Sequence, residues 1–405
     1  MEFHGTDQPA AAGGQTPRVI PTQMGLVERM VAQLGGKLVA LSEQGGLLRW
    51  ICRFFRSVTL WLTVVYFVLG TGLCLALRFV GEGNITTAFF LYLPPSLWLI
   101  PLVPLMFLGL LFHRLCFIAQ LAIGCSLLIW LGSPLIRLTT AAGHEETATI
   151  ISVMTYNRGQ NMNQSLQPFK NATHPDILVF QEAAGRAAGF QRSPDYAEFG
   201  HAVDIGEFTV LSRYPISSCS LVPANASPSS ARAARVVINW NGKPVSVYAV
   251  HLMTPREVLG SYMRGAFLWG VIGVPGTPWA AKRRQYQTFW DSQMNDAQEI
   301  MASVENDVNP CIIAGDFNAP HTGHIHQILT REWGDAHEVA GQGFGFTFPG
   351  VTRNPLSLGG PWMRIDYIFY DRHWKAIECV TEKNRPSQHR AVMARMLLLD
   401  GSADL

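Results

Sequence analysis

The first third of the chain is dominated by hydrophobic positions with very few polar ones between them. Three runs, Ser57–Val80, Ile85–Phe112 and Leu115–Ile136, are each long enough to cross a bilayer as a helix, which takes about 20 residues. The second run contains four prolines, so we expect a kinked or broken helix there, with a re-entrant hairpin as the alternative. The pattern therefore predicts about three transmembrane helices over residues 57–138.

From residue 150 onward the pattern changes to short β-branched runs bounded by Gly, Pro, Asn or Asp, which is typical of strands. The predicted strands are Ile150–Tyr156, Ile177–Phe180, Thr209–Leu211, Val236–Asn239, Val245–Val250, Cys311–Ala314, Ile365–Tyr370 and Val392–Leu397. Helical stretches are expected at Ser165–Ala172 and Arg283–Ser303. Because the strand runs are apolar on both sides of the alternation, we predict two sheets packed face to face with helices outside, over residues 150–400.

Composition separates these two parts further. Only 15% of the 405 residues are charged, against about 25% in a soluble globular protein, which argues against a disordered or purely soluble chain. Residues 1–140 carry 9 Lys and Arg against 5 Asp and Glu, which leaves residues 141–405 with 22 and 24 and a net charge of −2. The chain therefore has two chemically different parts, joined by a linker that we place at residues 139–149.

The basic residues predict the orientation in the cell membrane. Arg49, Arg53 and Arg56 lie just before the first apolar run, whereas the loop that follows this run has only Glu82. Under the positive-inside rule, residues 1–56 form a cytoplasmic N-terminal segment, which we expect to be partly disordered. Three crossings of a multi-pass protein then place residues 150–400 on the extracytoplasmic side.

Polar side chains occur at the ends of several predicted strands, where the fold itself does not need them. They are Asn157, Glu182, His251, Asp316, Asn318, Asp366 and His389. A carboxylate inside or beside an apolar strand is costly unless it is paired or binds a metal. Because such strand ends recur along the chain, we expect these side chains to converge on one site.

These residue types support metal-assisted attack on phosphorus. Mg²⁺ prefers oxygen ligands and is usually held by one or two carboxylates together with phosphate oxygens of the substrate. Glu182 is the best candidate ligand. Asp316 could orient or deprotonate the attacking water, and Asn318 could donate to a phosphoryl oxygen.

The histidines and arginines suggest further roles. Asp366 could hold His389 in one tautomer and stabilise its charged form. His251 could hydrogen-bond the phosphate or assist the leaving oxygen. Arg213 and Arg235 are candidates for substrate binding, although a surface or structural ion pair is an equally good interpretation of each.

Six motifs in this order resemble those of the endonuclease/exonuclease/phosphatase superfamily. They are Tyr-Asn157, Gln-Glu182, Val-His251-Leu, Gly-Asp316-Phe-Asn318, Arg-Ile-Asp366-Tyr and Ser-Gln-His389. The resemblance covers about residues 150–398. It implies a four-layered α/β sandwich, a divalent cation that is usually Mg²⁺ (Mn²⁺ is the alternative), and the roles proposed above, with Asn157 beside Glu182 at the metal. A membrane anchor before such a domain is similar to bacterial membrane-bound members.

One position departs from the family pattern. The family usually has Ser-Asp-His where this chain has Ser387-Gln388-His389. That Asp contributes to the metal environment in many members, whereas the neutral Gln388 offers only a carbonyl oxygen, so we place Gln388 among the substrate-binding residues. Weaker or differently placed metal binding is the expected consequence.

Three functions are compatible with these features. The first is a membrane-anchored, metal-dependent hydrolase of a phosphate ester or diphosphate, with a lipid as substrate because the anchor holds the site near headgroups. The alternative is a membrane-tethered nuclease, against which the net charge of −2 and the lack of a basic stripe argue. The third is a degenerate binding module, which only Gln388 supports. No obligate protein partner is evident.

The segment Pro255–Trp279 could extend the contact with membrane lipids. It is rich in apolar and aromatic residues, and Lys282, Arg283 and Arg284 follow it. It is either a long loop that covers the core or an interfacial element that dips into the bilayer.

Overall fold

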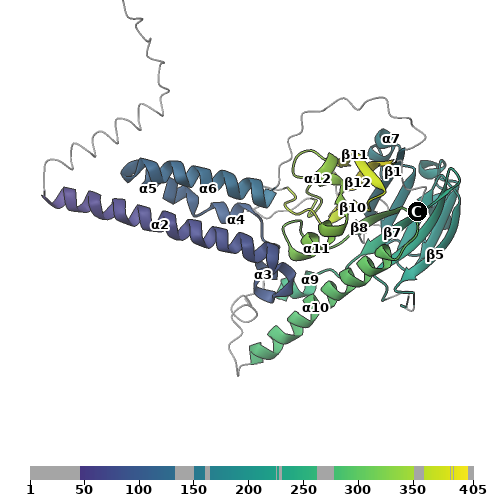
Figure 1. The fold of residues 1–405 in the computed structure, drawn as a ribbon, viewed down its shortest axis with the longest axis horizontal. Helices are drawn as coiled ribbons and strands as arrows, with labels where there is room; N and C mark the ends of the chain where they lie inside the picture. Colours follow the sequence, from purple (N-terminus) through teal and green to yellow (C-terminus); the bar gives the residue numbers. More distant parts are fainter. Residues whose placement is uncertain are drawn as a thin grey trace, which may run out of the picture.

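A bundle of apolar helices adjoins a two-sheet α/β part in the computed structural model (Figure 1). The structure describes residues 46–132, 150–159, 165–224, 226–227, 230–261, 278–350, 360–383, 385 and 387–399. The predicted linker at 139–149 and most of the predicted cytoplasmic segment lie outside these ranges, as do residues 262–277 of the proposed interfacial element. The domain boundaries at these places therefore stay predictions.

The described residues of the α/β part form two six-stranded sheets. The first has the order β11-β12-β1-β2-β4-β3 and consists of β1 (Ile150–Asn157), β2 (Ile177–Gln181), β3 (His201–Ile205), β4 (Phe208–Ser212), β11 (Trp374–Thr381) and β12 (Val392–Leu398). The second has the order β5-β6-β7-β8-β10-β9 and consists of β5 (Ile216–Val222), β6 (Ala233–Trp240), β7 (Lys243–His251), β8 (Cys311–Asp316), β9 (Gly334–Asp335) and β10 (Asp366–Tyr370). Both sheets are mixed, because β1 pairs with β2, and β7 with β8, in parallel.

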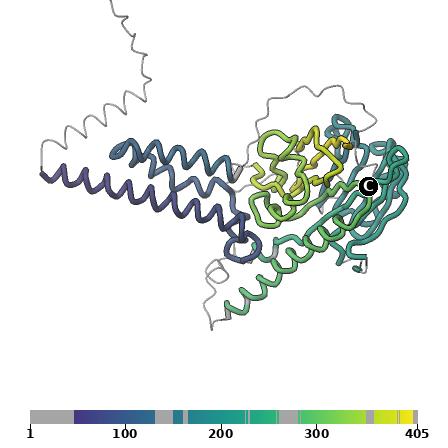
Figure 2. Tube along the Cα trace, in the orientation of Figure 1, coloured from purple at the N-terminus to yellow at the C-terminus, as the bar shows by residue number. Residues whose placement is uncertain are grey.

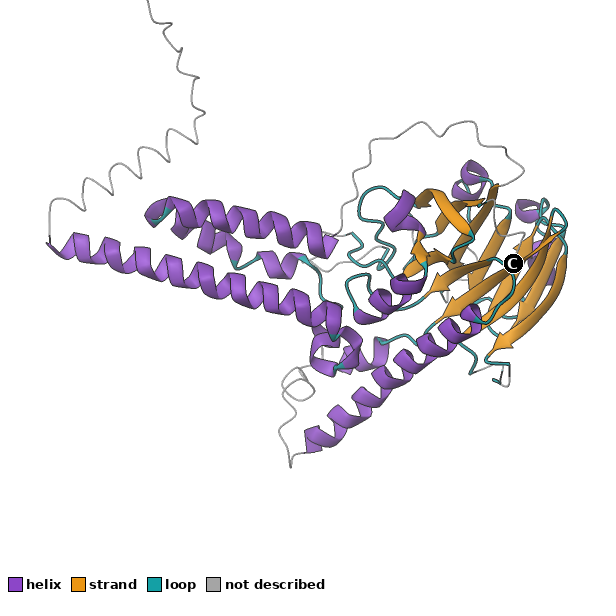
Figure 3. Cartoon of the chain, viewed as in Figure 1, coloured by secondary structure: helices purple, strands orange, loops and turns teal. Residues whose placement is uncertain are grey.

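The layering follows from the alternation of side chains along each strand. In β8, Ile312 and Ala314 belong to the core between the sheets, whereas Cys311 and Ile313 face the helices outside. The outer face of the second sheet packs against α10 (Pro278–Glu305) and α11 (His324–Glu332). The outer face of the first sheet packs against α7 (Phe169–Thr173) and α8 (Ala187–Gln191) (Figure 3). This arrangement confirms the predicted four-layered sandwich.

Each of the eight predicted strands corresponds to an observed one, but β3, β5, β9 and β11 were not anticipated. The predicted helix Ser165–Ala172 is wrong at its start, because α7 begins only at Phe169. Pro168 precedes this helix as its N-cap, and proline fits only the first turn of a helix. Two further short helices, α9 (Arg256–Ser261) and α12 (Ala336–Ala340), precede α10 and follow β9.

In the apolar part, α2 (Gly46–Phe79, 34 residues) is long and apolar enough to cross a membrane. It packs beside α5 (Leu102–Phe112) and α6 (Arg114–Gly132), and Gln120 on α6 donates a hydrogen bond to Thr63 on α2. The 11 residues of α5 reach only about 16 Å, against a hydrocarbon core of about 30 Å. One candidate span is thus supported, and the three crossings stay a prediction.

The second predicted span is interrupted, as its prolines indicated. Its first half, α3 (Ile85–Leu91), is bent by 89° from the segment Ser96–Phe112, which contains α4 (Ser96–Leu99) and α5. Ile85 and Tyr92 pack against Trp290 of α10 rather than facing outward. The run Ile85–Phe112 is therefore not one straight crossing, and four of its first nine residues, Ile85, Ala88, Leu91 and Tyr92, are buried in a cluster shared with the α/β part.

We call residues 81–93, which connect α2 to the bend, the anchor loop. The loop begins with a short 3₁₀ helix (Gly81–Gly83), and the carboxylate of Glu82 accepts hydrogen bonds from the backbone amides of His324 (2.8 Å) and Ile325 (3.2 Å). These amides open α11, so Glu82 caps a helix of the α/β part. The Cα trace shows the end of α2 and the turn that follows it beside α11 (Figure 2). Burial raises the pKa of Glu82 to about 7, although the amide hydrogen bonds partly oppose the shift.

The raised pKa of Glu82 predicts a stability that falls with rising pH. The folded state retains the proton up to about pH 7, whereas the unfolded chain releases it near pH 4.5, so this stabilising contribution is complete below pH 4.5 and lost as pH rises through 7. A shift of this size corresponds to about 3 kcal/mol. When the pH is raised from 5 to 8, the temperature of thermal unfolding in detergent should fall further for the native chain than for Glu82→Gln. Equal losses would show that Glu82 does not titrate in this way.

Candidate active site

Strand register brings most of the predicted site residues to one edge of the two sheets. Asn157 ends β1 opposite Gln181, so Glu182 follows directly at the same edge. In the second sheet, Asp316 pairs with His251 on one side and with Asp366 on the other. His389 lies just before β12, which begins opposite the last residues of β1. The sheets thus place one polar cluster where β1, β2, β7 and β8 end.

Asp316 lies at the centre of this cluster and is almost fully buried. Its carboxylate accepts hydrogen bonds from Asn157 Nδ2 (2.8 Å) and from the backbone amide of Asn318 (2.8 Å). Asp316 Oδ2 also lies 3.8 Å from His251 Nε2 and 3.7 Å from His389 Nδ1. Burial and the charge of Asp366 raise the pKa of Asp316, while the two histidines and Asn157 offset part of the shift.

His389 is held between two carboxylates. Its Nδ1 lies 3.1 Å from Asp366 Oδ2, and its ring packs against Phe348. Burial alone would lower the pKa of His389, but the carboxylates of Asp366 and Asp316 raise it to about 9. The imidazole is therefore a cation at neutral pH, and its charge balances part of the buried negative charge.

His251 is held in a similar way by a residue that the sequence did not single out. Its Nδ1 lies 2.9 Å from the carboxylate of Glu207, in the turn between β3 and β4. Burial would lower the pKa of His251, but the hydrogen bond to Glu207 and the charge of Asp316 raise it. With Nδ1 engaged by Glu207, Nε2 is the nitrogen that faces Asp316.

Two polar residues next to the strand ends have left-handed backbone conformations. The φ angle of Glu182 is 51° and that of Asn318 is 47°, in a region that residues other than glycine rarely adopt. Glu182 is exposed at the edge of the cluster, with Oε1 at 3.5 Å from Asn157 Nδ2. Asn318 Nδ2 donates to the carbonyl of Leu252, which leaves its second amide hydrogen for another acceptor.

The structure does not bring the two predicted arginines to this cluster. Arg213 follows β4 beside the start of β2, where its Nε donates to the carbonyl of Pro175. Arg235 forms a bidentate ion pair with Asp307, which precedes the start of β8, so its guanidinium points away from the end that carries Asp316. Gln388 is exposed beside His389, and its Oε1 accepts from Arg256 Nη2 at 3.0 Å.

The ion pair of Arg235 should matter for stability and not for catalysis. Asp307 is buried, and Arg235→Ala would leave its carboxylate without the guanidinium. We expect a loss of about 2 kcal/mol in the free energy of unfolding and a kcat/KM within twofold of the native value. Arg395→Ala, at an exposed pair with Glu378, is the control and should change stability by less than about 0.5 kcal/mol. A tenfold loss of kcat/KM in Arg235→Ala would instead restore Arg235 as a substrate contact.

The donor atoms of the cluster fit a hard divalent cation. Glu182 offers an exposed carboxylate and Asn157 an amide oxygen at the same edge, and Mg²⁺ prefers such ligands. Asp316, Asp366 and His389 also bring ligand atoms within 4.8 Å of one another. Among the described residues, His326, Asp335 and Glu338 form a second group, whose two carboxylates both form ion pairs with Arg364.

The chain is similar to a known protein family and to several solved structures. Residues 158–389 match the model of the Endonuclease/Exonuclease/phosphatase family. No curated protein matches the chain. Similar solved structures include a family member from Leptotrichia buccalis (16% identity over 61% of this chain and 99% of the other, TM-score 0.40). A Neisseria 3′ phosphatase bound to a product DNA hairpin (17%, 60% and 98%, TM-score 0.41) and a Bacteroides thetaiotaomicron mannosyl-6-phosphatase (12%, 61% and 100%, TM-score 0.43) are also similar.

The family match carries the assignment. It covers more than half of the 405 residues and includes the segments that end β2, β7 and β8 and the one that begins β10. The similar solved structures cover 60–61% of this chain, at identities too low to transfer an activity. The chain belongs to the endonuclease/exonuclease/phosphatase family.

Proposed function

We propose that this protein is a membrane-anchored, divalent-metal-dependent phosphohydrolase that acts on a phosphate ester or diphosphate, with a lipid at the membrane surface as substrate. The observation that carries the proposal is the buried cluster around Asp316, in which two carboxylates, two histidines and two asparagines meet at one sheet edge. Such a set can activate water and stabilise charge on a phosphoryl group.

In this proposal each residue has a defined task. Glu182 and Asn157 hold Mg²⁺ or Mn²⁺, which when bound neutralises phosphate charge and acts as a Lewis acid. Asp316 orients the attacking water and accepts its proton. Asn318 donates its remaining amide hydrogen to a phosphoryl oxygen.

The two histidines serve the charges that develop on the phosphoryl group and on the leaving oxygen. The His389 imidazolium, oriented by Asp366, stabilises negative charge on the phosphoryl oxygens. His251, oriented by Glu207, presents Nε2 to the phosphate or the leaving oxygen. The Glu207 carboxylate engages Nδ1 of His251 and leaves Nε2 for the substrate. The Asp366 carboxylate favours the positive charge of His389 that acts on the phosphoryl group.

A lipid is chosen as substrate because the residues that directly follow the candidate span contact the α/β part close to the site. Glu82, three residues after the end of α2, contacts the first turn of α11, and the loop before α11 carries Asn318 and directly follows Asp316. A membrane that holds α2 would therefore hold the site close to headgroups. The multi-pass topology and the extracytoplasmic placement of the site belong to the same proposal.

The substrate class can be tested with the full chain in detergent. Polyprenyl diphosphate, sphingomyelin, a phosphoinositide and single- and double-stranded DNA would each be supplied with Mg²⁺ or Mn²⁺, with Asp316→Ala as the inactive control. Turnover of a lipid that requires the metal and Asp316 is the expected result. Turnover of DNA alone would favour the tethered nuclease, and no turnover of any substrate would favour a binding module.

A further inference from the structure

The loop between β8 and α11, residues 317–323, directly contacts the anchor loop. Tyr92 donates a hydrogen bond from its hydroxyl to the backbone carbonyl of Asn318, with an O···O distance of 2.6 Å. This carbonyl belongs to the residue held in the left-handed conformation. Tyr92 lies 226 residues earlier in the chain, in a run whose composition indicated a membrane span.

A second hydrogen-bonded contact holds the other end of the same loop. Glu82 accepts from the amides of His324 and Ile325, which follow Gly323. The backbones approach closely here: a Cβ at Gly323 would lie 2.3 Å from Glu82 Oε1, and a Cβ at Gly81 would lie 2.5 Å from the amide nitrogen of His324. Glycine at both positions is therefore required for the contact, and Gly81 also has a φ of 41°.

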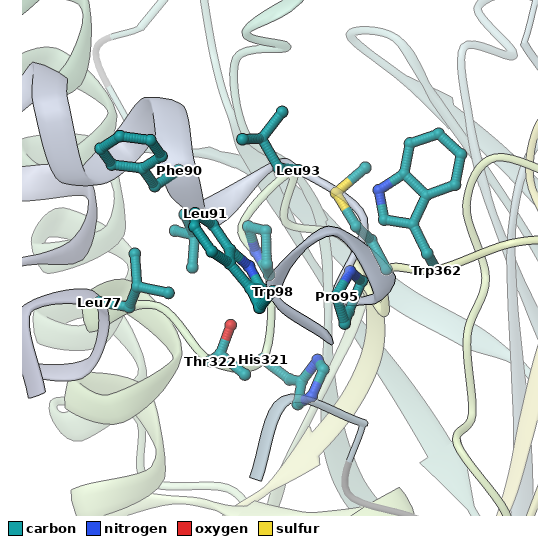
Figure 4. Close-up of a pocket in the computed structure, with 11 residues that line it drawn as sticks. Leu77, Phe90, Leu91, Leu93, Pro95, Trp98, His321, Thr322 and Trp362 are labelled. Carbon is teal, nitrogen blue, oxygen red and sulfur yellow. The ribbon is translucent and has the colours of Figure 1, made fainter. Parts of the chain in front are cut away.

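Apolar packing fills the space between these two hydrogen-bonded contacts. Trp362 donates from its indole to the carbonyl of Tyr92, and the Tyr92 ring packs against Trp290. Leu91 and Trp98 face His321 and Thr322 around a cavity with room for about one water molecule (Figure 4). The loop that carries Asn318 is thus enclosed by the anchor loop on this side.

We infer that the anchor loop is a working part of the active site, in which Tyr92 is a positioning residue for Asn318 and Glu82 holds the far end of the same loop. The inference rests on the proposed function for its catalytic consequence. The Asn318 backbone amide donates to Asp316 and its side chain to the carbonyl of Leu252. Its carbonyl also accepts from Gln293 Nε2, but at 3.5 Å against 2.6 Å for the Tyr92 hydroxyl. Without the tyrosine hydroxyl, the left-handed residue loses the shorter of the two hydrogen bonds to its carbonyl.

The test is Tyr92→Phe in the full chain, which removes one hydroxyl and keeps the ring. Because a displacement of about 1 Å can cost up to about a hundredfold in rate, we expect kcat to fall about tenfold or more while KM changes less than twofold. Tyr66→Phe is the matched control: its hydroxyl also donates to a backbone carbonyl, that of Trp98, but within the apolar helices. A kcat for Tyr92→Phe equal to that of Tyr66→Phe would overturn the inference.

Hydrogen exchange gives a reading that does not depend on the reaction. The amides of residues 317–323 should exchange faster in Tyr92→Phe than in Tyr66→Phe, and those of His324 and Ile325 faster in Glu82→Ala. Unchanged exchange in these amides would overturn the inference even if the native chain proved inactive. If the native chain hydrolyses no phosphoester but exchange responds as expected, the proposed function fails and the structural coupling stands.

Discussion

Replacing Asp316 with Asn should lower kcat for phosphoester hydrolysis by about 10³-fold or more, with a smaller change in KM. The amide keeps the size of the carboxylate and can still accept from the Asn318 backbone. It cannot accept a proton from water, and it removes one of the carboxylate charges that raise the pKa of His389. Loss of a general base alone costs about 10² to 10⁴ in rate. Release of 4-nitrophenol from bis(4-nitrophenyl) phosphate by the detergent-solubilised chain would measure the effect.

Asp371→Asn is the matched control for this substitution. Asp371 accepts from the amide of Cys311 at 2.8 Å, so it serves the start of the same strand whose end carries Asp316. The control should keep kcat within about twofold. If both variants lose activity equally, the loss in Asp316→Asn comes from the strand and not from the site.

Glu182→Gln should lower activity by about 10²-fold at 1 mM Mg²⁺, with a partial recovery at higher metal concentration. The side chain is exposed, and among the described residues its hydrogen-bond partner is Asn157, at 3.5 Å, so the substitution removes a charge without disturbing the core. The weaker site should also appear as a lower affinity for Mn²⁺ in calorimetry, measured without substrate. Removal of metal with EDTA should abolish the activity of the native chain.

The matched control here is Glu198→Gln. Glu198 forms an ion pair with Lys170 on the first sheet's helical layer, away from the strand ends of the site. It should leave both the Mn²⁺ affinity and the Mg²⁺ dependence unchanged. A Glu182→Gln chain with the native Mg²⁺ dependence would show that Glu182 is not a ligand.

The sequence indicated those strands whose side chains are buried on both faces. β2 and β8 are buried throughout, and their composition leaves little alternative to a central strand. β5 has four exposed positions in a row and β3 none that is fully buried, so neither has the apolar run by which a strand is recognised. Both were therefore missed, although each completes an edge of its sheet.

The site could be predicted where its residues follow predicted strands. Asn157, His251 and Asp316 are strand ends, and the order of the motifs was enough to expect them together. Glu207 was missed because it lies in the turn that follows β3, a strand that was itself missed. The glycine before Glu207 is the feature of the sequence that indicates a turn there, and in the structure Gly206 has a φ of 59°.

The anchor loop shows a different limit of sequence reasoning. Apolar composition is the same whether a residue faces lipid or the interior of a protein, so Ile85 and Tyr92 were assigned to a membrane span. The structure buries them against α10 and the loop that carries Asn318. Long-range contacts of this kind depend on the packing of the whole chain and have no local pattern.

In the proposed function, the cluster around Asp316 hydrolyses phosphoesters with a divalent metal. The most direct test is phosphate or alcohol release by the purified full chain from a lipid phosphoester in detergent micelles, followed as Mg²⁺ is titrated from zero in EDTA-treated buffer. We predict turnover that saturates with Mg²⁺ and is absent from Asp316→Asn under the same conditions. Turnover that is independent of Mg²⁺, or that persists unchanged in Asp316→Asn, would contradict the claim.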